Sequence, residues 1–413
     1  MNSTLEELNI QLYGSGSDFG EIVSIIKGVT RNDTITSLFL SYVIEDENYR
    51  YRNDYPNLGI DLPNEVLEQL LKNNKTLNAF CLIKKCSMEN ISLNIVNLNA
   101  PQTAIDIRDD AHVTKNSELM GSLLSHIKEL HSLRLHRPYS TYRIFISHPS
   151  LHTLSLPLNT AESAIELFTI LQTNTTLKAL RVTIDENTIS VGTSLQDLLK
   201  ENQTLNIFEV TTSLLSPITP ILPFLTTGLC HNNGQQQLRV PITLPVISDE
   251  LIPFLYILSQ NKNLTEIQFE LKLHFRFMLI RKTDELDNML IPLFYTQVLP
   301  AVTNMLQSHT TIKQLRILCF DLVEEYIPAD FNNLDKEEYA GVMEFLKTIY
   351  THPSLEHVLV GSLITFRKGT WDYGFYNRSI LKDIFKDQKQ TLIDRHKKEQ
   401  PHKPLPEVII TLT

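Results

Sequence analysis

A short phrase recurs along this chain of 413 residues. Asn or His is followed, usually two residues later, by Thr or Ser, and then by Leu-x-x-Leu-x-Leu or a close variant of it. One copy reads Asn202-Gln203-Thr204-Leu205, with Phe208 and Val210 at the later apolar positions. The ten copies begin at Asn2, Asn32, Asn74, His148, Asn174, Asn202, Asn261, His309, His352 and His402. A phrase that returns in one register indicates a repeat architecture, in which each unit buries its apolar side against its neighbours.

A segment with helical periodicity precedes nearly every copy. Apolar residues such as Ile165, Phe168 and Leu171 recur at steps of three and four, which predicts one buried helix face. The predicted helices span residues 19–27, 65–72, 117–129, 161–171, 194–200, 250–259, 293–307 and 337–350, with a last one at 379–399. Each helix ends at the Asn or His of the phrase. Because Asn tolerates the left-handed conformation, we expect it to close the helix there.

A short strand is predicted after each turn. The alternation of Phe208 and Val210 places two apolar side chains on the same face of a strand. Degenerate copies of the strand are expected at 130–135 and 238–244, and a doubtful one at 90–93. The unit is therefore helix, turn, strand and loop. Since a helix crosses back between strands, the strands are expected to be parallel.

With these residues the chain resembles a leucine-rich repeat protein of the long-unit, ribonuclease-inhibitor-like type. The resemblance implies an α/β solenoid, a horseshoe with a parallel concave sheet and convex helices, in roughly 11–13 irregular units. It covers residues 1–413 as a single array, with a capping region at 366–413. The chain departs from the family at the Asn three residues after the last Leu, which occurs once, as Asn159. We therefore expect that buried Asn ladder to be nearly absent and the coil to be irregular.

Composition narrows the class of function. The net charge of −10 argues against a general nucleic-acid binder, because binding phosphates requires clustered Lys and Arg. The four cysteines lack the spacing of a metal site or a disulfide framework. The first residues lack the pattern of a secretory signal, and no apolar run approaches the roughly 20 residues that cross a bilayer. We expect a cytoplasmic monomer that binds neither nucleic acid nor membrane.

The search for catalytic, cofactor and metal sites finds no convincing set. The turn at Gly14, Gly16 and Gly20 lies where a nucleotide would bind, but its glycine spacing is one residue too long for a dinucleotide fingerprint. The more favoured interpretation is a strand-to-helix loop in which Asp18 caps the helix. His126, His131 and His136 are five residues apart and His148 and His152 are four apart, but no zinc motif is present and no Cys or carboxylate cluster completes a ligand set. We therefore expect no enzyme, no cofactor and no metal.

The side chains between the alternating Leu positions point away from the core and are candidate partner-binding residues. They are polar and mixed in sign, which suits a protein partner better than a phosphate backbone. The candidates are Arg134, His136, Arg181, Glu209, Glu266, Gln268 and Arg316, with Glu270 and Gln314 beside them. Any solvated sheet face would show a similar mixture.

Three insertions offer further candidates. Residues 42–61 carry Tyr49 and Tyr51, which are suited to a binding hot spot or to a loop folded over the coil. Residues 321–338 are acidic, which favours a solvated loop over a surface that steers a basic partner. Residues 366–378 hold Trp371, the single tryptophan, where packing in the cap is somewhat favoured over a binding anchor.

The favoured function is a non-enzymatic scaffold that binds a protein of unknown identity through the concave sheet and the insertions. The alternative is a regulator of a small GTPase, since some proteins that the chain resembles contribute polar residues to the partner's active site. Arg134, Arg181 or Arg316 would serve there. A nucleotide-dependent enzyme built on Gly14, Gly16 and Gly20 is disfavoured, because an open doubly wound sheet has about six strands and no recurring turn phrase.

Overall fold

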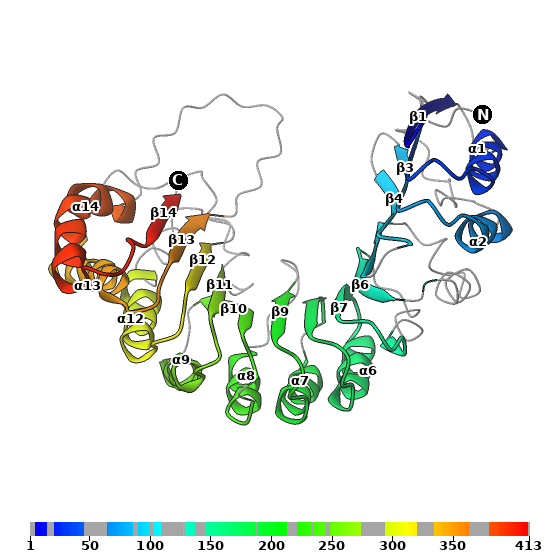
Figure 1. Ribbon diagram of the computed structural model, residues 1–413. Helices are drawn as coiled ribbons and strands as arrows, with labels where there is room; N and C mark the ends of the chain where they lie inside the picture. The colour runs from blue at the N-terminus through cyan, green and yellow to red at the C-terminus, as the bar shows by residue number, and fades with distance from the viewer. Residues whose placement is uncertain are drawn as a thin grey trace. The chain divides into compact units, whose positions relative to one another are not determined.

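The computed structural model describes residues 5–14, 20–44, 64–85, 90–99, 102–108, 127, 129–136, 146–186, 188–212, 221–232, 234–244, 248–273, 294–319, 334–362 and 380–411 (Figure 1). The strands are β1 (Glu7–Gly14), β2 (Ser37–Ile44), β3 (Ala79–Lys85), β4 (Asn90–Val96), β5 (Thr103–Arg108), β6 (Leu130–Leu135), β7 (Thr153–Leu158), β8 (Ala179–Ile184), β9 (Ile207–Thr212), β10 (Gln237–Leu244), β11 (Glu266–Leu273), β12 (Gln314–Cys319), β13 (His357–Ser362) and β14 (Glu407–Thr411). The helices are α1 (Gly20–Thr30), α2 (Asn64–Asn73), α6 (Ala161–Gln172), α7 (Ile189–Glu201), α8 (Leu222–Leu229), α9 (Ser248–Gln260), the π-helix η2 (Phe294–Val298), α12 (Leu299–Ser308), α13 (Lys336–Thr351) and α14 (Ile380–Glu399).

The strands form one 14-stranded sheet whose spatial order is the order of the sequence. The described pairings are parallel except at β4, which runs antiparallel to β3 and to β5. The expectation of parallel strands throughout is therefore wrong at β4. Only four residues separate Lys85 from Asn90, too few for a crossover helix, so the chain can only reverse. Asn97 and Gln102, which flank the return to β5, have the positive φ values 58° and 70°.

The chain divides into two compact units. Unit 1 consists of Met1–Leu158 and Thr176–Val182, and unit 2 of Asn159–Thr175 and Thr183–Thr413. The expected single array over 1–413 and the capping region at 366–413 stay predictions.

Each repeat buries the apolar residues of the phrase against its helix. In the repeat that contains β9, Leu205, Phe208 and Val210 are fully buried, as are Leu195 and Leu198 of α7. Burying one such side chain stabilises the fold by roughly 1.5–3 kcal/mol. The spacing of the phrase thus sets both the strand register and the core.

Most predicted helices are confirmed within two residues. The helix predicted at 194–200 begins earlier, because Thr188 caps it by accepting a hydrogen bond from the Val191 amide. The one predicted at 293–307 begins with the π-helix η2 before α12. Helix α8 was not predicted, and the predicted helix at 117–129 lies outside the described residues apart from 127 and 129.

The expectation that Asn closes each helix in a left-handed conformation is wrong. Asn202 has φ −87° and ψ 108°, and among the described non-glycine residues only Asn97 and Gln102 have positive φ. The Asn202 side chain acts instead. Its Oδ1 accepts hydrogen bonds from the amides of Thr204 (2.8 Å) and Leu205 (3.1 Å), while Nδ2 donates to the carbonyls of Leu171 (2.6 Å) and Asn174 (2.9 Å) of the preceding repeat.

These contacts recur from repeat to repeat. Asn74 bonds the carbonyls of Val29 and Asn32, and Asn232 bonds those of Leu199 and Asn202. A buried Asn ladder therefore exists at the turns before the strands. It is a different ladder from the one whose near absence was expected, which would lie three residues after the last Leu of each repeat. The ladder at the turns satisfies the carbonyls that helix ends leave open.

Toward the C-terminus histidine takes the same place. His352 Nε2 donates to the His309 carbonyl (2.6 Å), and Nδ1 accepts from the amides of Ser354 (3.2 Å) and Leu355 (3.0 Å). In the last copy of the phrase, Lys403 rather than His402 contacts the His352 carbonyl. We call the Asn and His residues of these turns, with their Thr and Ser neighbours, the turn edge.

Within the described part of the chain, no helix is both long and apolar enough to cross a membrane.

Candidate functional site

The candidate site is the strand face of unit 2, defined as the side chains of β9 to β14 that alternate with the buried ones. The described helices of unit 2 lie on the other side of these strands (Figure 1). The parallel register aligns the face into two rows. The first row is Ile207, Gln237, Glu266, Gln314, His357 and Glu407, and the second is Glu209, Arg239, Gln268, Arg316, Leu359 and Ile409.

Two adjoining hollows cross the face. A cleft of about 120 Å³ lies over β9–β12 and is lined by Glu209, Gln237, Leu238, Arg239, Glu266, Ile267, Gln268, Gln314 and Arg316. A groove of about 310 Å³ lies over β12–β14 and is lined by Gln314, Leu315, Arg316, His357, Val358, Leu359, Glu407 and Ile409. Gln314 and Arg316 line both hollows, so the cleft and the groove adjoin at these two side chains.

Arg239 organises the charges of the cleft. Its Nε donates to Oε1 of Glu270, whose side chain is fully buried, and its Nη1 lies 3.8 Å from Oε2 of Glu209. Gln268 Nε2 also donates to Glu270 Oε1 (3.4 Å). A buried carboxylate requires such partners, because an unpaired charge in the interior is costly. Arg239 is therefore largely engaged within the fold.

Two charged side chains of the face differ from Arg239. Glu266 is half-buried and Arg316 is exposed. In the described part of the chain, the structure gives neither of these two side chains an ion pair or a hydrogen bond. A partner that touches this face would meet both charges directly.

At the β13–β14 end of the strand face, apolar side chains lie beside a His–Glu pair. Leu359 is half-buried, and Ile409 of β14 is 43% exposed. In the other row, His357 Nδ1 lies 3.0 Å from Glu407 Oε2. The groove thus has an apolar floor with polar groups along one side.

The structure brings together four of the predicted site residues. Glu209, Glu266, Gln268 and Arg316 all line the cleft. The other three strand candidates belong to unit 1: Arg134 is exposed on β6, Arg181 is half-buried on β8, and His136 follows β6. His136 Nε2 contacts Asp106 Oδ1 at 2.9 Å. Burial lowers the pKa of His136, and Asp106 opposes that shift.

The predicted insertions lie largely outside the described residues. This holds for Tyr49, Tyr51 and Trp371. Tyr42, at the start of the predicted insertion at 42–61, is buried in β2 and therefore belongs to the strand rather than to an exposed loop. At the end of the acidic insertion, Asp335 caps α13 by accepting from the amides of Glu337 and Glu338, both at 2.8 Å. Those residues start a helix.

Sequence reasoning missed Arg239, Leu359, Ile409, His357 and Glu407. Arg239 was missed because the copy of the phrase before β10 has Gln235 where the others have Leu or Ile. The signal was Asn232, which lies midway between Asn202 and Asn261 in the sequence. Counting from it would have placed Arg239 in the same register as Gln268. The other four follow from the copies at His352 and His402.

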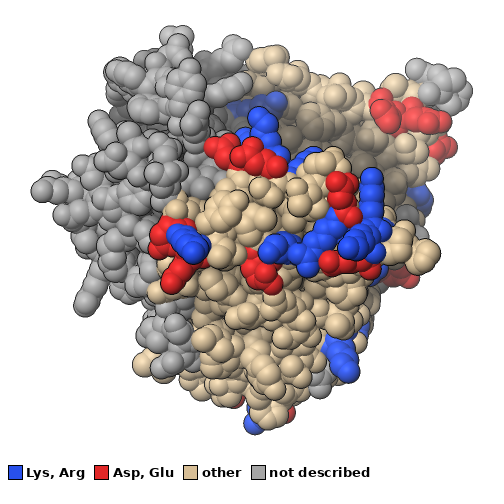
Figure 2. Space-filling model, turned by 90° about the vertical axis from the view of Figure 1, so that its left-hand side faces the viewer, with Lys and Arg blue, Asp and Glu red and all other residues tan. Residues whose placement is uncertain are grey.

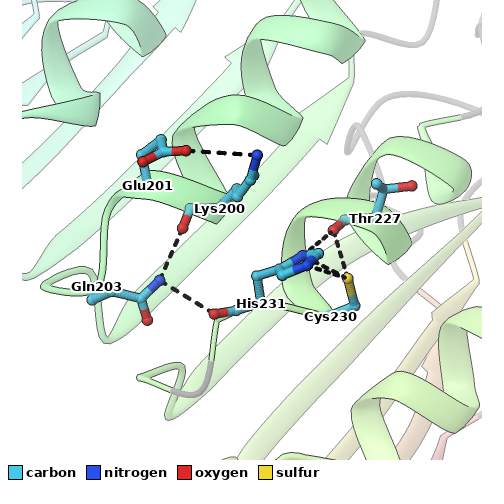
Figure 3. A network of polar contacts seen from close by, with 6 residues as sticks. All are labelled: Lys200, Glu201, Gln203, Thr227, Cys230 and His231. Atoms are coloured by element: carbon cyan, nitrogen blue, oxygen red, sulfur yellow. Dashed lines mark hydrogen bonds and ion pairs between the residues drawn. The ribbon is translucent and has the colours of Figure 1, made fainter.

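A Cys–His contact lies near the ends of α7 and α8 (Figure 3). The Cys230 thiol donates to the Thr227 carbonyl (3.0 Å), and its Sγ lies 2.8 Å from His231 Nδ1. Cys230 directly follows the C-terminus of α8, and both contacts stay at the end of that helix. In unit 1, burial raises the pKa of Cys81 to about 11, so this thiol stays protonated. Among the described residues, no group of three or more His, Cys, Asp or Glu could hold a metal ion.

The end of unit 2 that carries α14 has charges of both signs. Lys and Arg are interspersed with Asp and Glu over the face in Figure 2. On α14 itself, Arg395 Nε pairs with Glu399 Oε1 at 2.8 Å. This face is not the continuous basic surface that a phosphate backbone requires.

No protein-family model matches this chain, and a search of curated proteins found none that matches it.

Proposed function

We propose that this chain is a non-enzymatic scaffold that binds a protein partner through the strand face of unit 2. The observation that carries the proposal is the adjoining cleft and groove over β9–β14, lined by polar side chains among which Glu266 and Arg316 have no partner within the described chain. Protein interfaces combine apolar area with polar groups of both signs, and this face offers both. A charge that no internal contact uses contributes to specificity when a partner supplies its opposite.

The finer architecture belongs to the same proposal. We take the chain as a leucine-rich repeat array whose strand face is the concave side, working as a cytoplasmic monomer. The repeating phrase, the alternation of helix and strand, and the turn ladder support this interpretation. Regulation of a small GTPase stays a prediction from the resemblance, because no contact of Arg134, Arg181 or Arg316 favours it over other partners.

The test is capture of a partner by the full chain and by charge-reversal variants. Glu266→Lys places a like charge where the partner is expected to present a cation, so recovery of the partner from native lysate should fall at least about tenfold. Unfolding free energy should change by less than about 0.5 kcal/mol, because Glu266 contacts no charged group within the described chain.

The matched control is Glu201→Lys at the end of α7, which is exposed and only 3.8 Å from Lys200. It makes the same charge change away from the strand face and should leave capture unchanged. Equal capture by wild type and Glu266→Lys, or loss only with Glu201→Lys, contradicts the proposal.

A further inference from the structure

The β12–β14 end of the strand face differs from the β9–β11 end in how its arginine is used. Arg239 and Arg316 lie in the same row, separated by Gln268. Arg239 is engaged by Glu209 and by the buried Glu270. Arg316 has no such partner in the described chain and is exposed. Among the described side chains of this face, Arg316 is therefore a cation that no internal contact neutralises.

The apolar part of the groove begins beside that cation. Arg316 is in register with Leu359 on β13, which is in register with Ile409 on β14. Neighbouring strands lie about 4.8 Å apart, so the apolar surface starts one strand away from Arg316 and continues to the next. The groove of about 310 Å³ is at the small end of the range of ligand pockets, enough for one large side chain and its adjoining backbone.

Resting on the proposed function, we propose that this groove binds an acidic peptide segment of the partner. A carboxylate side chain of the segment pairs with the Arg316 guanidinium. A large aliphatic or aromatic residue one or two positions away lies against Leu359 and Ile409. Residues one or two positions apart in an extended chain are about 3.4–7 Å apart, which matches the distance from Arg316 to the apolar floor.

The surrounding charges favour a carboxylate over a phosphate group. Glu266 lies one strand from Arg316, and Glu407 lines the same groove. Glu407 is paired with His357, whereas Glu266 forms no ion pair within the described chain. One guanidinium among carboxylates suits a single negative charge, whereas a phosphate carries nearly two and is usually held by several cations.

The experiment selects a phage-displayed library of random heptapeptides on the full chain and measures binding of the enriched peptides as synthetic, labelled peptides. We expect the enriched sequences to share Asp or Glu within two positions of Leu, Ile, Met or Phe. Arg316→Gln should weaken binding about tenfold or more, because a hydrogen bond to a charged group is lost. Ile409→Ser should weaken it several-fold through lost apolar contact, and added salt should weaken binding to the wild type.

The matched control is Arg31→Gln, which removes an exposed arginine of unit 1 that lies on no strand and should leave the affinity unchanged. Circular dichroism of each variant verifies that it is folded. The proposal is overturned if no peptide is enriched, if the enriched peptides lack the acidic and apolar pair, if they carry phosphate-like polyacidic runs without the apolar residue, or if Arg316→Gln binds them like the wild type.

The two proposals fail in different ways. If Glu266→Lys abolishes partner capture but the peptides do not depend on Arg316, the face binds a partner through other chemistry and only the acidic-peptide proposal is wrong. If Glu266→Lys has no effect on capture, the proposed function itself is wrong.

Discussion

The turn edge and the strand face are both polar and both repeat with the period of the chain, yet their polar groups are used differently. At the turn edge, the Asn202 Nδ2 group donates to two carbonyls of the preceding repeat, and its Oδ1 accepts from two backbone amides of its own turn. On the strand face, Glu266 and Arg316 make no comparable contact within the described chain. A repeating polar residue is therefore structural where its side chain is hydrogen-bonded within the chain. Where the side chain makes no such bond, it is available to a partner.

The comparison predicts its largest effect at the turn edge. Replacing Asn232 with Ala removes two donors, to the carbonyls of Leu199 (2.8 Å) and Asn202 (2.9 Å), and the acceptor for the Gly234 amide. Asn232 is fully buried, so water cannot readily replace these bonds. The free energy of unfolding should fall by about 4 kcal/mol, measured by chemical denaturation.

The control is Asn304→Ala, an exposed asparagine of α12, which should change stability by less than about 0.5 kcal/mol. Equal effects of the two variants would contradict the distinction between polar groups that the fold uses and those it leaves free.

Within the turn edge, the asparagines and the histidines differ because only a histidine can take up a proton. Burial lowers the pKa of His352 to about 4, and the Lys403 charge adds to this, while the bond to His309 opposes it. The folded protein holds this imidazole neutral, because Nδ1 must accept from two amides. The unfolded chain binds the proton at a pKa near 6.5, so the contribution is complete above pH 6.5 and is lost as the pH falls toward 4.

Stability should therefore fall by up to about 3 kcal/mol between pH 6.5 and pH 4 through this residue. Denaturation curves across that range, compared with His352→Asn, measure it. Asn does not titrate and takes the same place in the other repeats, so the variant should lose most of this dependence. An identical pH profile in both proteins would contradict the account of His352.

Much of the fold could be predicted because one pattern encodes both core and register. The apolar positions of the phrase specify a buried strand face, as Leu205, Phe208 and Val210 do for β9. The reversal at β4 could not be derived from the phrase, since Asn90 begins a strand with no helix before it. The role of the turn Asn was misjudged because its partners, such as Leu171 and Asn174, belong to the preceding repeat. The tendency of Asn to close a helix concerns only the conformation of its own backbone and does not reveal such contacts.

The site was predictable in outline but not in its pairings. Alternation along the strands placed Glu209, Glu266, Gln268 and Arg316 on one face, as the structure has them. It could not tell that Glu270 is fully buried and contacts Arg239, because that depends on register between strands about 30 residues apart. Which arginine is free and which is engaged follows only from those cross-strand contacts.

The most direct test of the central claim asks which side of unit 2 a partner touches. A photo-cross-linking amino acid is placed at Gln314, which lines both hollows of the strand face, or at Ile252, which is 61% exposed on α9 and has the exposed Tyr256 one turn away. Each protein is irradiated in native lysate, and the covalent adducts are identified by mass spectrometry. The account predicts a reproducible protein adduct from Gln314 that Glu266→Lys abolishes, and none in common from Ile252. An adduct from Ile252 without one from Gln314 would contradict it.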